Sequence, residues 1–121
     1  MIPTRVHGVL DYIVGLALIA APWLFGFAYN GPGTWVPVVL GISIIVYSLM
    51  TAYELGLAPI IKMVPHLWLD GIGGAFLAAS PWLLGYADIV WIPHVLVGVV
   101  EVTVAVATRT QPRYVRAVAR P

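Results

Sequence analysis

The chain has 121 residues, of which 61% are hydrophobic and 9% are charged, and its mean hydropathy is +0.97. A water-facing globular protein usually carries about 25% charged residues, so this composition excludes an ordinary water-soluble domain. Cysteine is absent, which excludes disulfide frameworks, thiolate metal sites and thiol nucleophiles.

Four apolar segments fill most of the chain, at residues 6–28, 35–53, 66–87 and 91–108. Each is close to the ~20 residues that a helix needs to cross ~30 Å of hydrocarbon. None alternates like the strand of a membrane barrel, and helices satisfy the backbone in lipid. The sequence therefore predicts an all-α protein, a four-transmembrane-helix bundle that forms a single membrane domain over residues 1–121.

The first segment also invites comparison with a secretory signal peptide, because Arg5 precedes an apolar run. However, Asp11 places a charge inside the run, and Pro22 would directly follow the small-residue cleavage site. We expect this segment to be retained as a membrane span.

The third segment repeats the first. Residues 7–28 align without a gap with residues 66–87, and 12 of the 22 aligned positions are identical. The duplication divides the chain into repeat one (4–54), repeat two (63–108) and a basic tail (109–121). Because each repeat crosses the membrane twice, both enter from the same side. The two repeats should therefore be parallel, related by an axis along the membrane normal.

The duplicated phrase reads APWLFGFA at residues 21–28 and SPWLLGYA at residues 80–87. Its motif positions are Ser80, Pro81 and Trp82 in the second copy and Ala21, Pro22 and Trp23 in the first, where alanine replaces serine. Two copies of a two-helix unit with Ser-Pro-Trp in the first helix resemble the SPW-repeat family of small prokaryotic integral membrane proteins. The resemblance covers about residues 6–108. It implies a multi-pass protein of the bacterial or archaeal plasma (inner) membrane, and no known activity.

Proline within a helix leaves the carbonyl four residues earlier without its usual donor, so Pro22 and Pro81 should kink or end their helices. At about 1.5 Å per residue, the Pro-Trp pairs fall near the far surface of the bilayer. We expect the motif tryptophans to form an aromatic belt there with Trp35 and Trp91. The alternative is an aromatic ligand pocket.

The positive charges predict the orientation of the bundle. They lie before the first segment, between the second and third, or in the tail: Arg5, Lys62, Arg109, Arg113, Arg116 and Arg120. The positive-inside rule then places the N and C termini in the cytoplasm. The tail either lies against anionic headgroups or is a stop-transfer charge cluster with a frayed end.

Two polar pairs share helix faces near the cytoplasmic end. His7 and Asp11 are four residues apart, as are His66 and Asp70, and a glycine follows one turn deeper in each repeat. Small residues below a polar pair indicate a face packed against another helix. Three interpretations stay open: structural hydrogen bonding, a proton relay or substrate site, and a metal site. The spacing alone indicates a metal only weakly, and we expect no bound metal and no cofactor.

The fourth segment carries two ionisable residues that repeat one lacks. Aligning the Trp-x-Pro motifs of the two repeats puts His94 opposite Val38 and Glu101 opposite Ile45. The duplication therefore does not account for either residue.

Glu101 falls close to the middle of the bilayer, where a bare carboxylate would cost at least ~3 kcal/mol. It is expected to be neutral or paired, with Ser43 and Tyr47 as candidate partners, and it is either functional or a helix-locking hydrogen bond. His94 lies two turns away on the same face, at ~10 Å, too far for direct contact.

These features favour a noncatalytic scaffold or accessory subunit whose apolar faces contact the lipid bilayer and either a second copy of the chain or a larger membrane complex. The alternative is a small proton-linked transporter or channel that uses Glu101, His94 and the two His/Asp pairs. A membrane enzyme, or a haem or quinone site, lacks a recognisable catalytic set. No nucleotide loop, nucleophile elbow or zinc-protease motif is present. We therefore expect no enzyme and no nucleic-acid partner.

Overall fold

The computed structural model describes residues 1–111. Within them the chain forms four α-helices and no β-strand: α1 (Thr4–Leu24), α2 (Pro32–Leu49), α3 (Met63–Leu83) and α4 (Ile92–Ala107). The predicted all-α, four-helix fold is confirmed. Most of the basic tail, residues 112–121, lies outside the described residues, so the two interpretations of the tail stay predictions.

The helices α1, α2 and α3 end about four residues before the predicted segments do. The reason in α1 and α3 is a glycine rather than the proline. Gly26 and Gly85 have φ angles of 73° and 74°, and the next N–H bonds back to the carbonyl of Pro22 or Pro81 at 2.9 Å or 2.8 Å. This is the Schellman arrangement, which needs a left-handed residue after the helix. Each helix therefore continues two residues past its proline.

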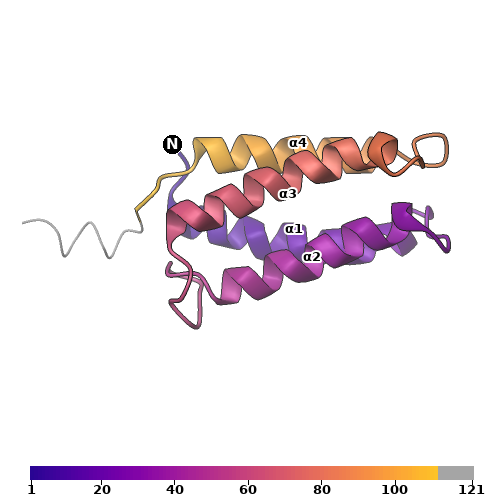
Figure 1. Cartoon of the computed structure of the whole chain (residues 1–121). Coiled ribbons are helices and arrows are strands. Elements are labelled where there is room, and N and C mark those ends of the chain that lie inside the picture. Colours follow the sequence, from indigo (N-terminus) through magenta and orange to yellow (C-terminus); the bar gives the residue numbers. More distant parts are fainter. Residues whose placement is uncertain (112–121) are drawn as a thin grey trace, which may run out of the picture.

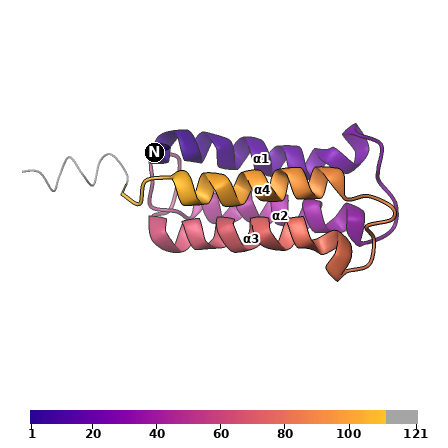
Figure 2. The same ribbon diagram turned by 90° about the horizontal axis from the view of Figure 1, so that it is seen from above.

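The four helices form two hairpins, which lie one above the other in Figure 1. In each layer the two helices of one repeat run side by side, α1 with α2 and α3 with α4. Figure 2 shows the same bundle from above, with all four helices along one direction. Helices α1 and α3 begin at the end of the bundle where α2 and α4 finish.

Paired glycines bring the two backbones of each hairpin together. A Cβ atom added to Gly41 would lie 2.5 Å from the carbonyl oxygen of Gly15, and one added to Gly98 would lie 2.5 Å from that of Gly74. Real Cβ atoms do not approach so closely, so any larger residue at Gly41 or Gly98 would push the helices apart. The glycines predicted to mark a packed face are the contact points of the hairpins.

The two repeats also form matching isolated β-bridges at one end of the bundle, Ile2 with Thr108 and Ile61 with Thr51. Ile2 and Ile61 are 59 residues apart, like the residues of α1 and α3. Thr51 and Thr108, however, are 57 residues apart, and so are the contact glycines of α2 and α4.

The alignment of α2 with α4 on their Trp-x-Pro motifs was therefore wrong by one residue. The corrected pairs are Pro37 with His94 and Ile44 with Glu101, in place of Val38 and Ile45. The contact glycines decide the register because each must face the neighbouring helix. The exposed tryptophans tolerate a shift of one position. His94 and Glu101 still have no ionisable counterpart in repeat one.

The buried apolar core is small and consists of Leu18, Ile44 and Leu77. Large apolar side chains instead cover the outside of the helices; Leu16 on α1 is 63% exposed and Leu96 on α4 is 61% exposed. By length and composition, α1 and α2 are long and apolar enough to cross a membrane, while α4 is apolar but has 16 residues.

Candidate functional site

The two predicted His/Asp pairs meet. Each histidine Nε2 contacts the carboxylate of its own helix and the carboxylate of the other repeat. His7 Nε2 lies 3.0 Å from Asp11 Oδ1 and 2.6 Å from Asp70 Oδ2. His66 Nε2 lies 2.9 Å from Asp11 Oδ2 and 3.1 Å from Asp70 Oδ2. We call these four residues the His/Asp ring.

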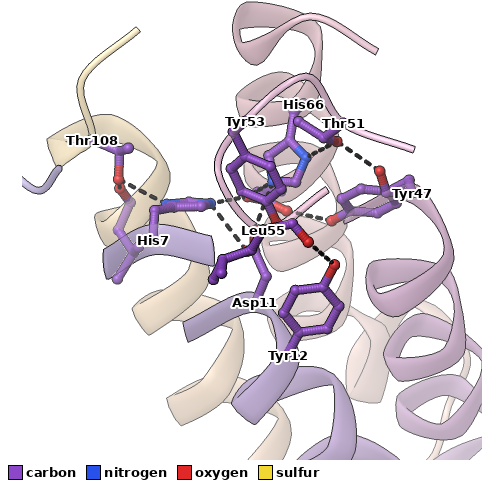
Figure 3. A network of polar contacts seen from close by, with 11 residues as sticks. His7, Asp11, Tyr12, Tyr47, Thr51, Tyr53, Leu55, His66 and Thr108 are labelled. Carbon is purple, nitrogen blue, oxygen red and sulfur yellow. Dashed lines mark hydrogen bonds and ion pairs between the residues drawn. The ribbon is translucent and has the colours of Figure 1, made fainter. Parts of the chain in front are cut away.

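The His/Asp ring is closed to solvent, since each of its four side chains is at most 2% exposed. The four-residue spacing puts each histidine one helical turn from its aspartate, and the hairpin packing turns both faces toward each other. The ring therefore joins α1 to α3, and with them the two hairpins (Figure 3).

A threonine fixes the outer nitrogen of each histidine. Thr108 Oγ1 lies 2.8 Å from His7 Nδ1, and Thr51 Oγ1 lies 2.7 Å from His66 Nδ1. Each threonine hydroxyl also donates to the carbonyl four residues earlier in its own helix, at 2.6 Å. Because a hydroxyl has a single hydrogen, its oxygen must accept from the imidazole. Both Nδ1 atoms therefore carry the proton, and both Nε2 atoms face the carboxylates.

A tyrosine hydroxyl donates to each aspartate of the ring. Tyr53 Oη bonds Asp11 Oδ2 at 2.8 Å, and Tyr47 Oη bonds Asp70 Oδ1. Burial, together with the charge of Asp11, raises the pKa of Tyr53 above its ordinary value, so this hydroxyl keeps its proton. Figure 3 shows Tyr47, Tyr53 and Thr51 gathered around His66, with Thr108 next to His7.

These threonines and tyrosines were not predicted as partners of the pairs. Thr51 and Thr108 end their apolar segments at matching places in the two repeats, which is the signal that could have identified them. Tyr47 was predicted to contact Glu101 instead. The prediction that the aspartates accept from histidine holds, and Arg5, the other partner considered, is exposed.

Glu101 does not bond either partner proposed from sequence, so that prediction was wrong. The Ser43 hydroxyl donates to the Val39 carbonyl of its own helix at 2.8 Å, and Tyr47 donates to Asp70. Among residues 1–111, the structure gives the Glu101 carboxylate no hydrogen bond, although the residue is only 6% exposed.

Glu101 instead lines a cavity of about 250 Å³ together with Asp70, Ser43 and Tyr47. Most of the other lining residues are apolar, among them the core residues Leu18, Ile44 and Leu77. The cavity is thus next to the His/Asp ring but lined mainly by hydrocarbon.

His94 lies apart from the other candidates, toward the end of the bundle that holds the Pro-Trp motifs. Its Nε2 donates to the carbonyl of Gly33 at 2.8 Å, and its ring packs against Phe27 and Tyr86. Its Nδ1 is buried without a hydrogen bond from any described residue and borders a second cavity of about 80 Å³. The structure does not bring His94 to the His/Asp ring.

The serine of the repeat motif has a structural partner. Ser80 Oγ bonds the carbonyl of Leu77, which Pro81 leaves without its usual donor, at 2.7 Å. Ser80 Oγ also contacts the hydroxyl of Tyr86. Ala21 and Phe27 occupy the matching places in repeat one, so both hydroxyls of this contact are missing there.

The motif tryptophans are on the surface. Trp23 lies 6.3 Å from Trp35 between ring centroids, and Trp82 lies 6.0 Å from Trp91. All four are exposed. Pro22 and Pro81, beside them, are buried.

The comparison of the chain with protein families finds a match to the SPW repeat domain over residues 5–108. No curated protein and no solved structure matches the chain.

Proposed function

The chain belongs to the SPW repeat domain family, and from this premise we propose that it is a noncatalytic scaffold or accessory subunit of the bacterial or archaeal plasma membrane. The family match and the apolar helices fit a membrane protein. In the proposal all four helices cross the bilayer, and the apolar outer faces contact lipid and either a second copy or a larger membrane complex.

The surface of the bundle supports this position. Exposed leucine, isoleucine and valine side chains occur along all four helices, for example Ile13, Ile42, Ile72 and Val99. Water-soluble monomers rarely leave so much contiguous apolar surface uncovered. The exposed tryptophan pairs at one end of the bundle fit an aromatic belt at the membrane surface better than a ligand pocket.

The described positive charges support the proposed orientation. Arg5 lies in the first turn of α1, Lys62 directly precedes α3, and Arg109 follows α4, all at the end of the bundle opposite the tryptophan pairs. In the proposal this end faces the cytoplasm, because cytoplasmic loops carry the excess of lysine and arginine. Two repeats that both begin at this end would be related by an axis along the membrane normal.

The observation that carries the scaffold proposal is the closure of the His/Asp ring. Its histidines and aspartates bond one another, and threonines and tyrosines occupy the outer positions. A polar group buried in this way stabilises one arrangement of the two hairpins. Toward the tryptophan end, the core of Leu18, Ile44 and Leu77 separates the ring from His94, so no continuous polar path links the two ends among the described residues.

The test is a flux and crosslinking experiment on the whole protein. Purified protein is reconstituted in vesicles, and pH-sensitive dye entrapped in them reports proton movement under an imposed gradient. In parallel, membranes are treated with a crosslinker and the products are sized. A scaffold gives crosslinked dimers or complexes and no flux above empty vesicles. Flux that scales with the amount of protein would overturn the proposal.

A second candidate function, a small proton-linked transporter or channel, is favoured by one observation: the Glu101 carboxylate faces a cavity without a hydrogen bond. Intramembrane carboxylates are frequent in proton pathways. If this function holds, Glu101→Gln should abolish the flux while leaving the protein folded. Ser43→Ala, on the same cavity, is the matched control and should retain the flux.

A further inference from the structure

We propose that the His/Asp ring is a binding site for one divalent transition-metal ion of the zinc class, held by His7, Asp11, His66 and Asp70. The four residues offer two imidazole nitrogens and two carboxylate oxygens that all lie within 4.8 Å of one another. This inference goes beyond the scaffold proposal, because metal binding depends on the ring alone and on no partner or membrane orientation.

The first argument is the number of hydrogens in the ring. Four nitrogen–oxygen contacts of 2.6 to 3.1 Å converge on two Nε2 atoms. An imidazole nitrogen carries at most one hydrogen, so two N–H groups must serve four contacts. A metal ion at the centre would be bonded to all four residues at once. Four atoms in a ring with sides of this length lie roughly 2 Å from its centre, which is the length of a Zn–N or Zn–O bond.

The second argument is the set of groups outside the ring. Metal-binding histidines usually donate their other ring N–H to an oxygen, and metal-binding carboxylates are themselves hydrogen-bonded. The Nδ1 protons of His7 and His66 are directed at Thr108 and Thr51, which leaves both Nε2 lone pairs free to bind a metal. Tyrosine hydroxyls donate to both aspartates. The spacing in sequence gave none of this outer shell.

The third argument is charge. Two ionised aspartates leave two negative charges in a buried site, which need two positive charges. Two protons on the Nε2 atoms supply them in the absence of metal. One divalent ion bound to two neutral imidazoles supplies the same charge, so binding releases two protons and leaves the net charge of the ring unchanged. Imidazole nitrogen with carboxylate oxygen suits zinc and neighbouring first-row ions better than calcium or magnesium.

The experiment measures zinc in the full-length protein, purified in detergent through a tag without histidine. After incubation with zinc and removal of loosely bound ion, elemental analysis should find one zinc per chain. His66→Gln and Asp70→Asn should each bind at least tenfold more weakly. His94→Gln and Asp88→Asn are the matched controls outside the ring and should bind like the wild type. Wild-type protein with less than a tenth of an equivalent, or controls that lose zinc as the ring variants do, would overturn the site.

The outer shell gives a finer test. Thr108→Val removes the acceptor of the His7 Nδ1 proton and should weaken zinc binding about 10–100-fold. Thr103→Val is its control, because Thr103 makes the same bond to a carbonyl of α4, at 2.8 Å, but is exposed and far from any ring residue in these contacts. Equal affinity of the two variants would contradict the assigned role of Thr108.

Spectroscopy keeps the proposal testable if the ring variants fail to fold. X-ray absorption at the zinc edge of the wild type should show nitrogen or oxygen ligands near 2.0 Å, two of them imidazoles. Cobalt in place of zinc should give visible absorption bands that excess zinc removes. A first shell without imidazole would refute the site. None of these outcomes depends on flux or crosslinking, so the site and the scaffold proposal can fail separately.

Discussion

The two repeats share a backbone plan but differ in their polar groups. Each has a glycine-paired hairpin, a Pro-Trp turn and one His/Asp pair. In the ring the repeats exchange partners, since His7 of repeat one bonds Thr108 of repeat two and His66 bonds Thr51. Around the ring the symmetry is lost: both tyrosines that reach the aspartates come from repeat one. The joint between the repeats is the part that both copies contribute to equally.

The largest effect is expected where the repeats contribute equally. Asp11→Ala and Asp70→Ala should each destabilise the protein by about 3–5 kcal/mol, because each leaves buried histidines without the opposing charge. Chemical unfolding in detergent, followed by tryptophan fluorescence, measures both. Asp88→Asn, at an exposed position, is the control and should have little effect. If one of the two ring variants were nearly silent, the ring would not be a shared joint.

The glycine contacts should come next. Gly41→Ala and Gly98→Ala should each cost roughly 1–3 kcal/mol, because the new Cβ atom meets a backbone carbonyl of the partner helix. Gly73→Ala is the matched control, since no heavy atom lies within 4 Å of a Cβ added there. That change should stabilise α3 by up to about 1 kcal/mol. Thermal unfolding of the three variants separates the cases, and destabilisation by Gly73→Ala to the same degree would remove the argument from close packing.

The Ser-Pro-Trp motif should show a smaller effect in one repeat only. Ser80→Ala should cost about 1 kcal/mol, because it removes the hydroxyl that bonds the carbonyl of Leu77. Tyr86→Phe should cost less, and the two changes together should cost less than their sum, since Ser80 and Tyr86 contact each other. The converse change in repeat one, Ala21→Ser with Phe27→Tyr, should not destabilise the protein. Additive losses would show that the two hydroxyls act independently.

The smallest effect near neutral pH is expected at Tyr53, which has Thr110 at the matching position of repeat two. Burial and Asp11 raise the pKa of Tyr53 in the folded protein. A raised pKa means that the contribution of this group is fully present below the unfolded value of ~10 and declines as the pH rises above it. Unfolding measured from pH 7 to 11 should therefore fall more steeply for the wild type than for Tyr53→Phe. Parallel pH profiles would rule out this contribution.

Local rules account for much of the fold. Length and hydropathy predict four helices, and the spacing within each pair puts histidine and aspartate on one face. The exact ends were missed because Gly26 and Gly85, and not the prolines, end α1 and α3. The one-residue error between α2 and α4 arose because the alignment followed exposed tryptophans rather than the glycines that touch the neighbouring helix.

The sequence by itself therefore determined the helices, the duplication and the helix face that carries each His/Asp pair, because these follow from periodicity within one helix. Only the tertiary structure decided that the pairs close into a ring, that Thr51 and Thr108 set the histidine protons, and that Glu101 faces a cavity instead of Tyr47. These contacts join helices that are distant in sequence. Their geometry depends on how closely the glycines let the hairpins pack and on how the two hairpins face each other, and no local pattern encodes those distances.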